Sequence, residues 1–285
     1  MKQRPWLFGI LICLIFLSAA LLFYLQSTGR SPQPYVYPNQ DKPRAHVYKV
    51  PDRLIDSVRL RVFYAVPQDK AAQSKGNWQE IISRVFSDVS RFHAIQFRGF
   101  SKIDLNIFPE QVLLDHESIF YDSEKTDAGN PHALLAVAKE IEQRIATPGG
   151  DLYREEFATR KDGEYVVMGI IYEGVGASGG LIYDSPLETL QEIALQLGVP
   201  ESLIHIVDVE SSDGFFLANS NCLASSVCGE PGPSLTYHEF AHALGIQDQY
   251  EGDHSFSEDI MGLGRFKPLD STYIDRSILK EMGVL

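Results

Sequence analysis

Acidic residues are missing from the first 30 positions and dominate the rest of the chain. The 285 residues include 25 Lys and Arg against 38 Asp and Glu, for a formal net charge of −13. Three basic residues lie in positions 1–30, so positions 31–285 hold 22 basic against 38 acidic residues, or −16. A body this acidic argues against binding nucleic acid or an anionic membrane face. Neutral, basic and peptide substrates remain open.

Cysteine is almost absent, with three in the whole chain. Cys13 lies in an apolar run, which leaves only Cys222 and Cys228 in the body. Their spacing does not fit a zinc knuckle, so a cysteine metal site is the weaker alternative. Outside the cytoplasm such a pair is more often bridged than free. We therefore expect a Cys222–Cys228 disulfide.

Charge is missing from residues 6–25, an apolar run of 20 residues. As a helix it would span roughly 30 Å, the thickness of a bilayer core. Its small residues lie inside the run, which favours a retained transmembrane signal-anchor over a cleaved signal peptide or a core helix. Basic residues precede it, so residues 1–5 are predicted to be cytoplasmic and the body periplasmic or extracellular. Secretion after signal cleavage is the alternative.

Residues 26–50 hold four prolines among polar residues and are predicted to be an extended linker. The rest, 51–285, shows no internal repeat and is expected to be one catalytic domain of α+β or α/β type. Alternating or apolar runs predict strands, and a period near 3.6 with capping residues predicts helices. The expected strands are 58–66, 102–108, 164–172 and 203–209; the expected helices are 78–92, 131–146, 185–198 and 269–283.

The segment 238–250, HEFAHALGIQDQY, carries the clearest chemistry. Ser234 is the expected N-cap of a helix that Gly245 ends. Residues four apart share a helix face, so His238 and His242 can bind one cation. Glu239 lies beside them, where it can act as a general base on a metal-bound water. A buried histidine pair in a core helix is the plain alternative.

Gly245 allows the chain to turn back and present Asp248 as a third ligand. Three protein ligands and one open position are what a catalytic zinc site needs. Nearby side chains that could replace Asp248 are Glu251, Asp253 and His254. A thermolysin-like arrangement would instead need a later glutamate, of which Glu258 is too near and Glu281 is terminal.

The string His238-Glu239-x-x-His242-x-x-Gly245-x-x-Asp248 resembles the metzincin zinc signature, in the version with aspartate as third ligand. Snapalysin-type and immune inhibitor A-type proteases are similar. Met261 then corresponds to the methionine turn below the metal, although methionine is also a common core residue. The resemblance covers about residues 234–264. It implies an α+β fold: a twisted mixed sheet with two or three packed helices, the zinc helix, and a small C-terminal subdomain with a final helix.

The resemblance also implies a zinc endopeptidase, in which one Zn²⁺ activates water and Glu239 accepts its proton. Tyr250 is a possible transition-state stabiliser, with a packing role as the alternative. A structural Ca²⁺ in the acidic segment 248–259 is possible, but a solvated loop is favoured. An extended substrate would pair with 164–172 or 214–219. The alternatives are a zinc hydrolase of non-peptide amides and a non-catalytic binding protein.

Overall fold

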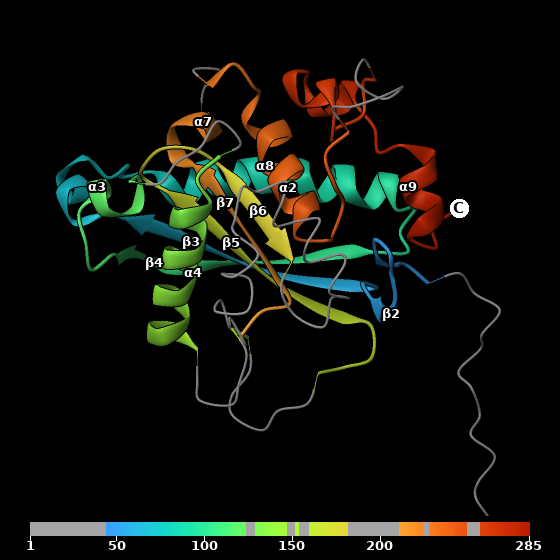
Figure 1. The fold of residues 1–285 in the computed structure, drawn as a ribbon, viewed down its shortest axis with the longest axis horizontal. Coiled ribbons are helices and arrows are strands. Elements are labelled where there is room, and N and C mark those ends of the chain that lie inside the picture. Colours follow the sequence, from blue (N-terminus) through green and yellow to red (C-terminus); the bar gives the residue numbers. More distant parts are fainter. Residues whose placement is uncertain are drawn as a thin grey trace, which may run out of the picture. The chain divides into compact units, whose positions relative to one another are not determined.

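The computed structural model describes residues 44–123, 129–146, 152–153, 160–181, 211–224, 228–249 and 257–285. Within them the fold is mixed α/β (Figure 1). The membrane segment 6–25 and the expected elements 185–198 and 203–209 lie outside these residues. In the part of the chain described here, no helix is both long and apolar enough to span a bilayer.

A five-stranded sheet forms the centre of the described fold, in the order β4–β3–β5–β7–β6. Strands β4, β3, β5 and β7 are parallel, and β6 pairs antiparallel with β7. A separate antiparallel pair joins β1 to β2. The strands are β1 (His46–Val47), β2 (Val50–Leu54), β3 (Ser57–Val66), β4 (Lys102–Leu113), β5 (Glu164–Tyr172), β6 (Ser178–Leu181) and β7 (Gly214–Asn219).

Helices cover both faces of this sheet. The α-helices are α2 (Trp78–Gln96), α3 (Ser118–Tyr121), α4 (Pro131–Ile145), α7 (Ser220–Ala224), α8 (Gly232–His242) and α9 (Arg276–Glu281). Short 3₁₀ helices are η1 (Gln68–Gln73), η4 (Leu263–Phe266) and η5 (Leu269–Ser271). One core cluster joins α2, α8 and α9 to the sheet, and a second joins α4 to its opposite face.

The positions of α2 and α4 follow from the strand order. The connection from β3 to β4 contains α2, and the connection from β4 to β5 contains α4. These two crossovers run in opposite directions across the sheet. Because parallel crossovers are right-handed in nearly all proteins, their helices must lie on opposite faces. Helix α8 packs on the same face of the sheet as α2.

Several predicted elements match the structure closely. The apolar run 164–172 is β5, which lies inside the sheet and is buried along almost its whole length. The second helix begins as expected, since the Asn130 side chain accepts a hydrogen bond from the Ala133 amide at 3.1 Å and Pro131 follows. The strand predicted at 102–108 continues to Leu113; its Pro109 is tolerated because β4 is an edge strand.

Two boundaries predicted from the sequence are wrong. The linker was expected to reach residue 50, but Val47 is buried and β1 pairs with β2 from His46 onward. The last helix was expected at 269–283 and is only α9, because Pro268 opens a separate 3₁₀ turn and Asp275 caps a new start. The Asp275 side chain accepts from the Ser277 amide at 2.7 Å.

A buried histidine links α2 to α8. Ser101 Oγ donates to the Ile55 carbonyl at 2.6 Å, so it accepts from His93 Nε2 at 2.8 Å. His93 Nδ1 is then the acceptor for the Tyr237 hydroxyl at 3.2 Å. Burial lowers the pKa of His93 to about 3, so the ring is neutral in the folded protein.

Because His93 is buried in its neutral form, the folded protein should lose stability in acid. Its folded pKa lies below the unfolded value of about 6.5, so the stability it contributes is present above pH 6.5 and is lost as the pH falls toward 3. The loss is on the order of 4 kcal/mol. We expect His93→Gln to flatten the pH dependence of urea unfolding between pH 6.5 and 3. The exposed control, His116→Gln, should keep the wild-type slope; equal slopes in all three proteins would contradict the assignment.

Candidate metal centre

Helix α8 presents the two motif histidines and runs from Gly232 to His242. Ser234 is not its N-cap as expected, because Pro231 occupies that position and Ser234 Oγ donates to the Lys267 carbonyl at 2.6 Å. Pro233 lies in the first turn, where its fixed φ suits the helix and its missing N–H costs no intrahelical hydrogen bond. Gly245 follows the helix with φ of +81°, the left-handed conformation expected there. The chain therefore turns back beside His242.

Each histidine ring is fixed by a backbone carbonyl. His238 Nδ1 lies 3.0 Å from the Ile260 oxygen, and His242 Nδ1 lies 2.8 Å from the Ile246 oxygen. A carbonyl oxygen can only accept, so Nδ1 carries the proton on both rings. In the neutral rings Nε2 then has an unshared electron pair. The sequence did not show these acceptors, because both lie in loops.

The two Nε2 atoms face Asp248. Its Oδ1 lies 3.3 Å from His238 Nε2 and 3.5 Å from His242 Nε2. One ligand atom from each of the three residues lies within 4.8 Å of the others. Three electron-rich atoms at this separation repel one another unless a proton or a metal cation lies between them. Asp248 therefore lies where a third ligand could complete a metal site, whereas Glu251, Asp253 and His254 lie outside the described residues.

The pKa values of the two histidines and of Asp248 are shifted by burial and by one another. Burial lowers the pKa of His238. Burial also acts to lower the pKa of His242, but the Asp248 carboxylate outweighs it and the pKa is raised. For Asp248 burial acts to raise the pKa, and the two histidines outweigh it, so the pKa is lowered. An ionised Asp248 thus favours positive charge on His242, whereas burial prevails at His238.

Glu239 lies on the same helix and is 6% exposed. Burial raises the pKa of Glu239 to about 8. Without a cation nearby the carboxyl would be mostly protonated at neutral pH. A metal ion held by the neighbouring residues would lower this pKa and restore the carboxylate that a general base needs.

The donor set fits zinc. Two imidazole nitrogens and one carboxylate oxygen are ordinary zinc ligands, and three protein ligands leave a position open. The second nitrogen of each ring donates to a carbonyl, which is the usual outer-shell partner of a metal-bound histidine. In the described part of the chain this is the one cluster of its kind. The described residues therefore suit a zinc ion, and three is the number of protein ligands that catalytic zinc sites use.

The segment around Met261 lies next to these ligands. Met261 is buried, and its carbonyl accepts from the Gln249 amide at 2.9 Å, beside Asp248. Tyr250 lies outside the described residues. Glu258 pairs with Lys267 at the surface instead of joining the metal ligands, and Glu281 is in α9. Neither glutamate supports the thermolysin-like alternative.

The acidic segment 248–259 was expected to be a solvated loop, and one of its residues contradicts this expectation. Asp259 is fully buried and accepts from the Met261 amide at 2.6 Å. It therefore shapes the turn and is not part of a solvated acidic surface. Its spacing two residues before Met261 is typical of an aspartate-stabilised turn and is the sequence signal that would have shown it.

The cysteine pair braces the start of α8. Cys222 of α7 and Cys228 form a disulfide with their Cα atoms 5.4 Å apart. A Cβ at Gly232 would lie 2.3 Å from the Leu223 carbonyl oxygen, so α7 contacts the first turn of α8 directly. The other end of α7 is held as well, because Lys75 Nζ lies 2.9 Å from Ser220 Oγ and 2.8 Å from Glu173.

Strand β6 passes close to Glu239 and His242, which the sequence did not predict. A Cβ at Gly179 would lie 2.4 Å from the Glu239 carbonyl oxygen and 2.7 Å from His242 Cβ. The double glycine Gly179-Gly180 was the available signal. The expectation that 164–172 or 214–219 offers a free edge is wrong, because β5 and β7 are both inside the sheet and β6 is at its edge.

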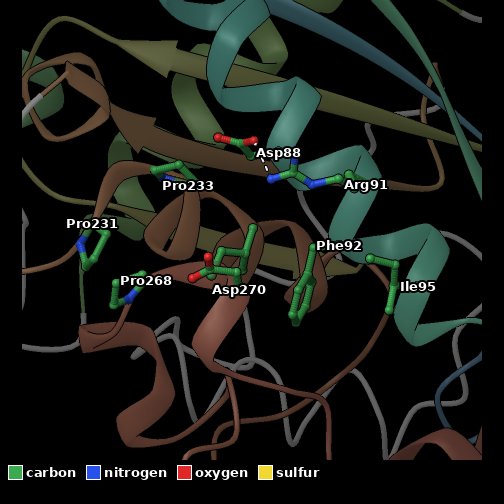
Figure 2. Close-up of a pocket in the computed structure, with 9 residues that line it drawn as sticks. Asp88, Arg91, Phe92, Ile95, Pro231, Pro233, Pro268 and Asp270 are labelled. Carbon is green, nitrogen blue, oxygen red and sulfur yellow. Dashed lines mark hydrogen bonds and ion pairs between the residues drawn. The ribbon is translucent and has the colours of Figure 1, made fainter.

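A separate cleft lies where α2, the start of α8 and η5 meet (Figure 2). Its volume is about 260 Å³, and prolines, Phe92 and Ile95 line it. Asp88 and Arg91 at this cleft pair with each other at 2.9 Å. None of the three candidate ligands lines it. The cleft therefore offers no group for the chemistry of the histidine site.

Comparison with known proteins adds no relative: no protein-family model matches the chain, and no curated protein matches it significantly.

Removing a ligand should abolish metal uptake. We expect about one zinc per chain in the wild type and much less in His242→Ala or Asp248→Ala, measured by elemental analysis after dialysis. The loss of affinity should exceed the roughly 10–100-fold typical of an outer-shell change. His116→Ala is the matched control and should keep its zinc. Affinity should also fall as the pH drops through the raised pKa of His242, because protons compete with the metal.

Gly179 should be intolerant of a side chain. The added methyl of Gly179→Ala must displace β6 or α8, which should cost about 1–3 kcal/mol of stability and weaken zinc binding. Gly76→Ala is the control, since its Cβ meets nothing within 4 Å. Equal melting temperatures and zinc affinities for the two variants would show that β6 does not constrain the site.

Proposed function

We propose that this chain is a zinc-dependent endopeptidase with a metzincin-like α+β catalytic domain. One observation carries the proposal: the lone pairs of His238 and His242 converge on Asp248 because each ring donates its other nitrogen to a carbonyl. Glu239, the candidate base, is adjacent on the same helix. We further propose that residues 6–25 anchor the domain outside the cytoplasm.

In this proposal His238, His242 and Asp248 hold the metal, and Glu239 moves the proton. Zinc bound there would polarise a water molecule and the scissile carbonyl. The Glu239 carboxylate accepts a proton from the attacking water and passes it to the leaving amine. Burial raises the pKa of Glu239 and a bound metal ion would lower it again, so the two opposing effects together would set how readily the group accepts and releases the proton.

The position of β6 favours a peptide over a small amide. This strand is at the edge of the described sheet, and Gly179 lets its backbone approach α8 near Glu239 and His242. An extended peptide paired with that edge would run alongside the proposed base and metal ligands. Main-chain pairing would hold a substrate of at least several residues, which is what an endopeptidase requires.

Glu239→Gln is the direct test of the base. The amide cannot accept the proton, so turnover of a peptide library, followed by mass spectrometry, should fall about 10²–10⁴-fold. Zinc content should stay near one per chain. Glu80→Gln, an exposed change on α2, should leave both properties unchanged.

Three results would contradict the proposal in different ways. A wild type that binds zinc but cleaves only non-peptide amides would show that the substrate is not a peptide. Zinc binding without any turnover would indicate a non-catalytic binding protein. Full turnover in the Glu239→Gln variant would show that Glu239 is not the general base.

A further inference from the structure

Asp259 gathers hydrogen bonds from four amides around the Met261 turn. Its Oδ1 accepts from Met261 at 2.6 Å, and its second carboxylate oxygen accepts from Asp275. Its own carbonyl accepts from Gly262 at 2.9 Å and from Gly264 at 2.8 Å. The residue is fully buried. One side chain and one carbonyl thus fix both the turn and its link to the start of α9.

The next residue supplies the acceptor that orients His238. The Ile260 carbonyl accepts from His238 Nδ1 at 3.0 Å. The Ile260 amide donates to the Tyr273 carbonyl at 2.8 Å, next to the parallel bridge between Asp259 and Tyr273. Ile260 is therefore held on both sides, by the turn that Asp259 closes and by the strand-like contact to Tyr273. The direction of its carbonyl follows from these two constraints.

We infer that Asp259 is a positioning residue for the metal centre, which holds the Ile260 carbonyl where it fixes the ring and tautomer of His238. The inference rests on the proposed metal site and adds a residue that touches neither the metal nor the substrate. Outer-shell acceptors of this kind set ligand orientation and basicity. Because a backbone carbonyl cannot be removed by substitution, Asp259 is the side chain through which this contact can be changed.

His242 provides an internal comparison. Its Nδ1 donates to Ile246, in the turn that follows α8, and Gly245 shapes that turn. The carboxylate of Asp259 binds its own turn and Asp275, whereas the ring of His242 is held by the separate Ile246 turn. A change at Asp259 should therefore disturb His238 and spare His242.

The test uses the full-length chain with ¹⁵N-labelled histidine, with and without zinc. In Asp259→Asn the amide oxygen can still accept from Met261, but the NH₂ group opposes the Asp275 amide. We expect the His238 Nδ1–H resonance to shift or exchange faster with solvent, while the His242 resonance is unchanged. Zinc affinity, measured by chelator competition, should fall about 10-fold.

Asp275→Ala is the matched control, because it removes the side-chain cap of α9 and leaves the Ile260 contact intact. It should keep both histidine resonances and the zinc affinity. A folded Asp259→Asn protein with both resonances and the affinity of the wild type would overturn the inference. So would equal disturbance of His238 and His242, which indicates a general loss of structure.

A second variant covers the case in which Asp259→Asn does not fold. In Asp259→Ser the hydroxyl can still accept from Met261 but does not reach Asp275, and the same selective effect on His238 is expected. If neither variant folds, Asp259 is a residue of global stability and the inference is wrong. Failure of the proposed function is distinguishable, since a wild type that binds no zinc would still show whether Asp259 fixes the His238 Nδ1–H.

Discussion

The site depends on two hydrogen bonds from imidazole to backbone carbonyl. They come from different loops, Ile246 after α8 and Ile260 before the Met261 turn. Each places a proton on Nδ1 and leaves an electron pair on Nε2. With Asp248 facing both rings, the folded chain brings three electron-rich atoms together and so favours a cation between them. Two histidines that only pack in the core would not need both Nε2 atoms to face the same carboxylate.

The rest of the described fold holds α8 against these loops. The sheet supplies β6, whose Gly179 permits close contact with the carbonyl end of the helix. The disulfide and the Lys75–Glu173–Ser220 contacts hold α7 against the beginning of α8. On the other side, Tyr237 donates to the buried His93 of α2. Each contact limits movement of the helix, so the two histidines keep a common direction.

The parts of this arrangement that the sequence could predict are those set by local rules. The spacing of His238 and His242 requires only helix periodicity, and the position of Asp248 requires only that Gly245 turn the chain. Likewise β5 was evident from its unbroken apolar run, and α4 from Asn130 and Pro131. These features depend on neighbours within a few residues.

The features missed depend on contacts between distant segments. The Ile260 carbonyl meets His238 across 22 positions, and β6 meets α8 through Gly179, where the double glycine alone does not identify the contact partner. Serine is a residue type typical of an N-cap, but the Ser234 hydroxyl donates to the Lys267 carbonyl instead. The last helix is shorter than its apolar pattern because Asp275 begins a new helix after a 3₁₀ turn. In each case tertiary contacts outweighed local preference.

The central claim is that these three side chains form one metal centre, and X-ray absorption at the zinc edge tests it most directly. In the zinc-loaded full-length chain we expect two imidazole ligands, oxygen ligands for the rest, and no sulfur. His238→Ala should remove one imidazole from the spectrum of any zinc that remains bound. A sulfur ligand, fewer than two imidazoles in the wild type, or no zinc uptake at all would show that these three residues do not form a zinc site.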